Sequence, residues 1–443
     1  MSRLLRFLPE RLQDDLMHSR TLRGVCARGA AAVAGIVLGP QRQLRWFTRA
    51  LEMSGSLEFH QKIASRLQQR GVFEKRTPWV ETVRSSGRYR EHFGRRSTLN
   101  RSVILKAPGA DGEKGLLLMT FEYNWARLCL GLNEEELAWM AANFNFVFSA
   151  SWSPTDYAVL GLVVASFPGT LFVQSCNYGE RQLIEAFHPR LRCLETLPCD
   201  WISPGSHLPK PFAERSIDLL MVANWGRFKR HWEFFEILAQ LPADLKVHLI
   251  GQPAEGRDSN FIRQLARQKG VPQQLTIHER LPIQEVAALQ ADARVSVIMS
   301  RREGCCVAAV ESLMAGCALA MRDDAHVGPV EYINPQTGAR LRPGHLAEDL
   351  QNLLQRAQQT EPRQWCLQNA SGDTSWQKLN RLIREHELAS SRPWTQDLAV
   401  PSWRPHPTFR HAEEQQRLRP IYHELHLKFP KVFAEDLAEN SWK

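Results

Sequence analysis

The sequence predicts an α/β protein with two Rossmann-like, doubly wound domains and an extra helical basic region at its amino end. The first observation behind this prediction is that strand-like and helix-like segments alternate over residues 215–385. The second is a similar alternation over residues 101–205, and the third is the arginine-rich character of residues 1–100. With 443 residues, of which 43% are hydrophobic, the chain can bury two sizeable cores.

The region 1–100 holds the whole positive excess of the chain. It carries nineteen Lys and Arg against eight Asp and Glu, a net charge of +11, whereas the whole chain carries +9. Residues 5–25 and 42–71 interleave arginines with Leu, Phe and Trp, which predicts amphipathic helices. Such helices either lie on an anionic membrane surface or form a cap with a solvated basic face. Because no nucleic-acid-binding motif accompanies the charge, we expect no nucleic-acid partner.

Residues 101–205 form the first predicted α/β domain. The glycines of the segment 107–115 indicate a hairpin or loop, since neither a dinucleotide fingerprint nor a Walker lysine is present. The proline-rich run 198–211 predicts the linker to the next domain. We expect strands at 101–108, 114–122, 144–151, 170–177 and 191–198, and helices at 134–143, 155–166 and 179–188.

Residues 215–385 form the second predicted domain, in which strands and helices alternate strictly. Alternation of this kind means a parallel, doubly wound sheet, because each crossover between parallel strands needs a helix. Gly270 and Gly316 follow apolar-periodic runs and predict helix ends. We expect strands at 218–223, 245–253, 273–281 and 293–300, and helices after residue 224, at 259–270, at 283–293 and at 307–314.

The segment 300–321 places two glutamates in one strand–turn–helix unit. Glu303 is predicted in the turn at the carboxyl end of a buried strand, where open α/β sheets bind ligands. Glu311 is predicted about one turn inside the following helix, whose first free N–H groups would face a diphosphate. An ionised carboxylate at that place accepts hydrogen bonds from ribose hydroxyls. The spacing therefore suits a nucleotide-sugar site.

This segment resembles the signature of the group 1 family of retaining glycosyltransferases, which have the GT-B fold. Cys305 and Cys306 stand where the family prefers an aromatic and a small residue, and Ala318 and Leu319 replace its usual Pro-Val. The resemblance implies two domains that face each other across a cleft, with the second binding the donor. The positions that match the signature are Ser300, Arg301, Glu303, Gly304, Glu311, Ala315 and Gly316.

The likeness continues upstream, in the segment 224–242. Lys229 and Arg230 fall on the family's lysine position and its neighbour, where positive charge stabilises the leaving nucleoside diphosphate. Asn224 occupies the place of the family's usual arginine, and Arg227, three residues on, is our candidate to supply the guanidinium. The alternative is that Arg227, Lys229 and Arg230 only begin an ordinary basic helix, although basic charge at a helix amino end opposes the macrodipole.

The resemblance also implies the remaining contacts of the donor. The backbone around His278 to Arg280, after the third strand of the domain, is the candidate contact of the base, and Gly304, Cys305 and Cys306 line the sugar and diphosphate. No metal and no cofactor are expected. In the retaining mechanism the leaving diphosphate itself can take the proton of the acceptor, so no dedicated base is required.

The acceptor side is expected in residues 101–205, and the helical tail 386–443 is expected to cross back to that domain. The family's acceptor-side histidine and Gly-Gly loop are not recognisable. Polar and aromatic residues at two predicted strand ends are the plausible acceptor contacts: Glu122, Tyr123, Asn124, Ser151, Trp152 and Asp156.

The expected function is transfer of a sugar from a nucleotide-diphosphate donor to a glycan or lipid-linked acceptor. The alternative is a catalytically weakened GT-B protein that acts as a surface-binding or scaffold module, which Asn224 and the Cys305-Cys306 turn favour. A phosphorylase of the same fold would need a pyridoxal-phosphate lysine that we do not find. The best apolar span, 24–39, is shorter than the ~20 residues that cross a bilayer. Nine scattered cysteines indicate a reducing compartment, so we expect a cytoplasmic protein, free or peripheral on the inner face of the membrane.

Overall fold

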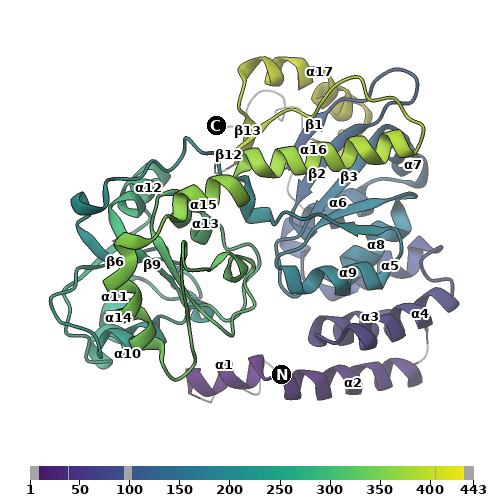
Figure 1. Ribbon diagram of the computed structural model, residues 1–443. Helices are drawn as coiled ribbons and strands as arrows, with labels where there is room; N and C mark the ends of the chain where they lie inside the picture. The colour runs from purple at the N-terminus through teal and green to yellow at the C-terminus, as the bar shows by residue number, and fades with distance from the viewer. Residues whose placement is uncertain (1–8, 38, 94–101, 405, 434–443) are drawn as a thin grey trace. The chain divides into compact units, whose positions relative to one another are not determined.

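The computed structural model describes residues 9–37, 39–93, 102–404 and 406–433 (Figure 1). The chain divides into two compact units, and both are discontinuous in sequence. Unit 1 consists of Met1–Asp14 and Cys199–Ser375, and unit 2 of Asp15–Pro198 and Trp376–Lys443. These limits differ from the four predicted segments, because the start of the basic region belongs to unit 1 and the rest of that region to unit 2.

Unit 1 contains a six-stranded sheet in the order β11-β10-β9-β6-β7-β8, and all of its strand pairs are parallel. The order reverses between β6 and β9, so the predicted doubly wound sheet is confirmed here. The apolar strands supply the core of the unit, as fully covered parallel strands must. The strands are β6 (Ile217–Val222), β7 (Val247–Gly251), β8 (Leu275–Glu279), β9 (Ala293–Ile298), β10 (Ala318–Arg322) and β11 (Gly338–Leu341).

The helices of unit 1 also follow the sequence pattern. Asp258 caps the helix α11 by accepting from the Phe261 N–H. Gly316 follows α13 with φ +80°, the left-handed conformation that ends a helix and favours glycine. The helices are α10 (His231–Leu238), α11 (Ser259–Gln268), α12 (Ile283–Asp292), α13 (Val307–Met314), α14 (Leu346–Arg356) and α15 (Pro362–Asn369).

Unit 2 contains a five-stranded sheet in the sequential order β1-β2-β3-β4-β5. The hairpin of β1 and β2 is antiparallel and the other pairs are parallel. The α/β class is confirmed, but the doubly wound prediction needs a correction for this sheet. A sheet whose strand order never reverses is wound in one direction, so right-handed crossovers place their helices on one face. The strands are β1 (Ser102–Lys106), β2 (Gly115–Thr120), β3 (Phe144–Ser149), β4 (Leu171–Gln174) and β5 (Leu191–Cys193).

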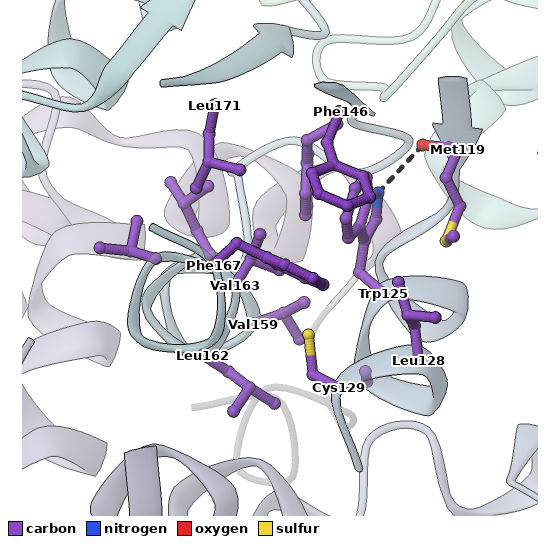
Figure 2. Close-up of a cluster of buried hydrophobic side chains, with 14 of the residues drawn as sticks. Met119, Trp125, Leu128, Cys129, Phe146, Val159, Leu162, Val163, Phe167 and Leu171 are labelled. Atoms are coloured by element: carbon purple, nitrogen blue, oxygen red, sulfur yellow. Dashed lines mark hydrogen bonds between the residues drawn. The ribbon is translucent and has the colours of Figure 1, made fainter. Parts of the chain in front are cut away.

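The helices that connect the parallel strands cover one face of the unit 2 sheet, and aromatic side chains pack between these helices and the sheet. Figure 2 shows Trp125 beside Phe146 and Phe167, with the Trp125 indole donating to the Met119 carbonyl at 3.0 Å. The Trp125 and Phe146 rings meet edge to face, with centroids 5.9 Å apart. The helices of this layer are α6 (Glu122–Gly131), α7 (Glu134–Asn143), α8 (Tyr157–Ser166) and α9 (Arg181–Phe187).

The opposite face of this sheet is covered by a helix from the far end of the chain. Helix α16 (Gly372–Ala389; Figure 1) contacts β3 and β4 through its last turn. Asn145 of β3 donates to Glu387 at 2.9 Å, and the Phe172 ring of β4 packs edge-on against His386. The tail then adds the hairpin β12 (Pro401–Arg404) and β13 (His406–Phe409) and the helix α17 (Ala412–Lys428). The Tyr422 hydroxyl of α17 accepts from the Ile104 N–H of β1, so the tail packs on the sheet of unit 2.

The basic amino-terminal region is mainly helical over its described residues, as predicted; residues 1–8, 38 and 94–100 of the predicted region lie outside them. Its later helices pack on α8 and α9, and the Trp79 ring fills the space above Gly161 of α8. The helices are α1 (Glu10–His18), α2 (Arg20–Ile36), α3 (Pro40–Met53), α4 (Leu57–Gln69) and α5 (Arg76–Ser86). In the described part of the chain, no helix combines the length and the apolar character needed to span a bilayer.

Candidate functional site

The candidate site lies at the reversal point of the unit 1 sheet. Strands β6 and β9 are neighbours there, and their connections lead to helices on opposite faces of the sheet. Open α/β sheets bind ligands in the crevice that such a reversal leaves outside the carboxyl ends of the strands. The loop after β6 (residues 223–230) and the loop after β9 (residues 299–306) both begin at this point.

The loop after β6 is held in place by its backbone and by one buried indole. Trp225 is fully buried, and its Nε1 donates to Glu279 at 2.9 Å. Asn224 accepts from the Gly226 N–H through its side-chain oxygen, a local turn contact. A short 3-10 helix, Arg227–Lys229, follows. The loop therefore presents Lys229 from a fixed backbone.

The two strongest predicted residues meet at this point. The Lys229 Nζ lies 2.7 Å from Glu303 Oε2, and the two side chains are only 14% and 8% exposed. The other carboxylate oxygen, Glu303 Oε1, is buried and has no hydrogen-bond partner within the described ranges. A buried acceptor without a partner is costly, so this oxygen is ready to accept from a bound molecule.

The helix after Glu303 begins as predicted. Cys306 is the N-cap of α13 and makes no side-chain capping bond, while the Val307 and Ala309 N–H groups donate to the Cys305 and Cys306 carbonyls at 3.1 and 3.2 Å. Glu311 is the fifth residue of α13, half-buried, and so about one turn inside the helix. The N–H groups and both glutamates thus belong to one rigid strand–turn–helix unit.

A network of ion pairs supports both loops from behind. Arg230 is 2% exposed and binds Glu233 through two hydrogen bonds of 3.0 and 2.8 Å. Arg322 donates to the same glutamate at 2.6 Å. Burial opposes the ionisation of Asp324, but the hydrogen bonds and charge of Arg322 hold its pKa below the ordinary value. The members of this network are Asp14, Arg230, Glu233, Arg301, Arg322 and Asp324.

Comparison with known proteins agrees with this geometry. Residues 207–370 match the family model described as glycosyl transferases group 1. This part of the chain is a glycosyl transferases group 1 domain. It contains Lys229, Glu303 and Glu311, and it makes the protein a glycosyltransferase.

Several solved structures are similar to the chain at low sequence identity. Sucrose-phosphate synthase (tll1590) from Thermosynechococcus elongatus is 16% identical with a TM-score of 0.48, over 72% of this chain and 80% of that one. The lipopolysaccharide outer core galactosyltransferase WaaB is 14% identical with a TM-score of 0.46, over 62% and 76%. Anabaena Alr3699/HepE, solved with UDP and glucose, is 13% identical with a TM-score of 0.43, over 62% and 77%. No match was found among the curated proteins.

Three thiols gather beside the Glu303 loop of the transferase domain. Burial, together with a hydrogen bond to Cys305, raises the pKa of Cys199. Burial and the nearby Glu303 charge likewise raise the pKa of Cys306. These two thiols are therefore neutral at pH 7 and behave as small apolar groups, not as nucleophiles.

The other predicted donor contacts in the loops after β6 and β9 differ in their exposure and in their partners. Arg227 is exposed, and no ion pair of its side chain occurs within the described residues. Arg230 turns its guanidinium into the internal network, which does not favour the donor contact predicted for it. Gly304 and Cys305 are half-buried in the loop after β9. None of these contacts is tested by the geometry alone, and each stays a prediction.

The predicted base contact lies at the edge of the same sheet. His278 is in β8, two strands from β6, and its Nε2 lies 3.2 Å from His248 Nδ1. Burial lowers the pKa of both imidazoles, so both are neutral at pH 7. Arg280 turns the chain with φ +61° and donates its N–H to the Gly251 carbonyl at 2.8 Å. The backbone at 278–280 is thus a tight turn at a strand end.

The acceptor-side candidates lie in unit 2, where strands β2 and β3 end. Glu122 opens α6, is fully buried, and accepts from the Ser151 and Trp152 N–H groups at 3.1 Å each. Burial raises the pKa of Glu122 to about 8. The Trp152 side chain is 54% exposed, and Asp156 caps α8.

Sequence reasoning missed the acidic members of the network behind the loops. Asp14 lies 216 residues before its partner Arg230, and no local pattern signals a pair at that separation. Glu233 and Asp324 sit within a few residues of predicted site segments, so charge patterning near the motif was the one available signal.

Proposed function

We propose that the protein is a retaining GT-B glycosyltransferase that moves a sugar from a nucleoside-diphosphate donor to a glycan or lipid-linked acceptor. The observation that carries this proposal is the Lys229–Glu303 pair at the reversal of the sheet, with Glu303 Oε1 buried and without a partner. The Lys229 cation suits the diphosphate side of the bond that breaks in a nucleotide sugar, and the Glu303 acceptor suits the sugar side.

Lys229 is the proposed contact of the diphosphate. In the ligand-free site its ammonium is neutralised by Glu303. A bound diphosphate would compete for the ammonium and be stabilised further by the first N–H groups of α13. As the glycosidic bond breaks, negative charge grows on the leaving diphosphate, and a fixed cation stabilises that charge most in the transition state. Positive charge from the protein fits a reaction that needs no metal ion.

Glu303 is the proposed contact of the transferred sugar. Its Oε1 can accept from a sugar hydroxyl, and its negative charge favours the positive charge that develops at the anomeric carbon. Glu311, farther into the helix, is the proposed acceptor of the ribose hydroxyls. In a retaining reaction on one face of the sugar, the departing diphosphate takes the proton of the attacking hydroxyl, so Glu303 keeps its charge throughout.

The membrane inner face is the proposed place of action. Helix α2 packs on α3 and presents an exposed stripe of small and apolar residues that includes Val25, Ala32 and Ile36. Ile36 is 79% exposed and Val25 is 52% exposed. Exposed apolar side chains on an arginine-rich helical region suit an anionic lipid surface, which would also supply a lipid-linked acceptor. The nine free cysteines fit the reducing cytoplasm.

A binding screen tests the proposal. Thermal unfolding is followed with a panel of nucleotide sugars and free nucleoside diphosphates, and the donor with the largest shift is used for transfer to candidate glycans. Ligand at 100 times its dissociation constant stabilises the fold by ~2.7 kcal/mol. Lys229→Ala should lose the shift, whereas the control Lys269→Ala, which removes a half-buried ion pair with Glu236, should keep it. A shift without any transfer supports the scaffold alternative, and no shift with any nucleotide contradicts both the donor site and the proposal.

A further inference from the structure

The amino-terminal helix α1 contributes a buried carboxylate to the back of the candidate site. Asp14 is 8% exposed and belongs to unit 1 although it lies 185 residues before the rest of that unit. Its Oδ2 accepts from Arg230 Nη1 and lies 3.5 Å from Arg301 Nη1. One acidic side chain thus contacts two arginines that come from different loops.

The two arginines sit next to the proposed catalytic residues in sequence. Arg230 follows Lys229 directly and has φ +58°, a left-handed backbone that a non-glycine residue adopts only when its surroundings hold it there. Arg301 lies two residues before Glu303. Asp14 therefore ties the loop after β6 to the loop after β9, at the point where these loops bring Lys229 and Glu303 within 2.7 Å.

The charges explain why this carboxylate matters. Three guanidinium groups of the network lie close enough that Arg322 and Arg301 oppose the positive charge of Arg230 and, with burial, lower its pKa. Asp14, Glu233 and Asp324 balance these three charges. Without Asp14, the three guanidinium groups, of which Arg230 and Arg322 are buried, would share two carboxylates, and the excess charge would push the two loops apart.

A second ion pair fastens α1 at a different place. Arg257, in the loop after β7, binds Glu10 with an Nη2–Oε1 distance of 3.1 Å. This pair holds the helix to unit 1 but does not join the loops of Lys229 and Glu303. Glu10→Gln is therefore the matched control, because this substitution removes the same charge from the same helix.

We propose that Asp14 is a positioning residue for sugar transfer. It holds the Lys229 loop and the Glu303 loop in the relative position that the reaction needs. The inference rests on the proposed function and extends it to a helix outside the matched family region 207–370. Because Asp14 acts on geometry and not on the donor, its loss should lower turnover far more than it weakens binding of the nucleotide.

The experiment compares Asp14→Asn, Asp14→Ala and Asp14→Glu with Glu10→Gln in the full chain. With the donor found by the binding screen, Asp14→Asn and Asp14→Ala should lower kcat at least ~10-fold while donor KM changes less than ~3-fold. Asp14→Glu should recover most of the turnover, since its carboxylate can still reach the arginines. Glu10→Gln should stay within ~2-fold of the parent protein.

Hydrogen exchange gives a readout that does not depend on activity. In Asp14→Asn the amides of residues 223–230 and 299–306 should exchange faster, whereas Glu10→Gln should leave both segments unchanged. Equal exchange and equal kcat in the two variants overturn the inference. Faster turnover in Asp14→Asn also overturns it and identifies α1 as an inhibitory segment. If the parent protein transfers no sugar, the proposed function fails, and the exchange result alone decides whether Asp14 holds the loops.

Discussion

The Lys229 ammonium lies 2.7 Å from Glu303 Oε2, so the two residues predicted to act on opposite ends of the donor bind each other. This pair is nearly buried, so removal of one member would leave the other charge without its partner and destabilise the loops. A diphosphate that binds Lys229 would release Glu303 toward the sugar. Donor binding would then free Glu303 Oε2 as a second acceptor beside Oε1.

Loss of the Lys229 charge should reduce the chemical step. We expect Lys229→Ala to lower single-turnover sugar transfer by at least two orders of magnitude, about 3 kcal/mol of transition-state stabilisation. Lys269→Ala, which removes the half-buried ion pair with Glu236 of α10, is the control and should be near the parent rate. A Lys229→Ala variant that folds and turns over normally would rule out the site.

Arg227 should show whether the loop supplies a second cation. Its side chain is exposed beside Lys229, and we expect Arg227→Ala to reduce transfer nearly as much if it replaces the arginine that Asn224 lacks. Steady-state kinetics at several nucleotide concentrations separate binding from chemistry. A variant with parent kinetics would leave Lys229 as the sole proposed cation of the diphosphate.

Substitution of Glu303 and of Glu311 should affect different steps of the reaction. Glu311→Gln should weaken nucleotide binding more than it slows the bound-state reaction, because a ribose contact is equal in ground and transition states. Glu303→Gln should slow transfer with little effect on the affinity for free nucleoside diphosphate. Calorimetric titration and single-turnover transfer measure the two effects. The opposite pattern would mean that the ligand lies the other way along α13.

Burial of Glu122 should make unfolding depend on pH. Its pKa is about 8 in the folded protein, because burial disfavours the charged form, and lies near 4.3 when the chain is unfolded. The folded state then binds the extra proton between these values, so this residue lowers stability as pH rises from about 4.3 to 8. Glu122→Gln should flatten the pH dependence of the urea midpoint over that window. The exposed Glu135→Gln should not, and equal curves for both variants would contradict the assignment.

Gly251 should be required for the shape of the loop after β6. A Cβ at this position would lie 2.4 Å from the Ala223 carbonyl oxygen and 2.7 Å from the Trp225 ring. We expect Gly251→Ala to destabilise the fold by roughly 1–3 kcal/mol, since neither backbone nor buried indole can move freely. Gly205→Ala is the control, because a Cβ there meets nothing within 4 Å. Equal denaturant midpoints for the two variants would show that the loop adjusts to the added Cβ.

The membrane proposal has its own test. Ile36→Asp on the α2 stripe should reduce sedimentation with phosphatidylserine vesicles at low salt, whereas Leu427→Asp should not, although both side chains are well exposed. High salt should release the parent protein, because exposed charge is screened over ~8 Å at physiological ionic strength. Vesicle binding that is absent at all salt concentrations would leave the helices α2–α5 as a cap.

Local sequence patterns predicted those parts of the site that lie within one short segment of the chain. The β9–α13 unit follows from an apolar strand, a turn and an apolar helix, and the helix and its glycine end are confirmed. The meeting of Lys229 with Glu303 follows from parallel topology, since both residues succeed neighbouring strands. Periodicity could not predict the strand order of unit 2, because residues 102–193 have the same alternation whether the sheet is wound one way or two. The choice depends on α16, which covers the second face and whose Glu387 lies 242 residues after its partner Asn145 in the chain.

The discontinuity of unit 1 limits how the transferase domain can be cut and grafted. A fragment of residues 199–375 would include every matched residue of the family region yet lack Asp14, and would carry Arg230 and Arg301 with one counter-ion missing. Chimeras that exchange donor specificity between enzymes would inherit this imbalance. A grafted domain therefore needs the α1 segment supplied as a second piece, either fused through a linker or added as a peptide.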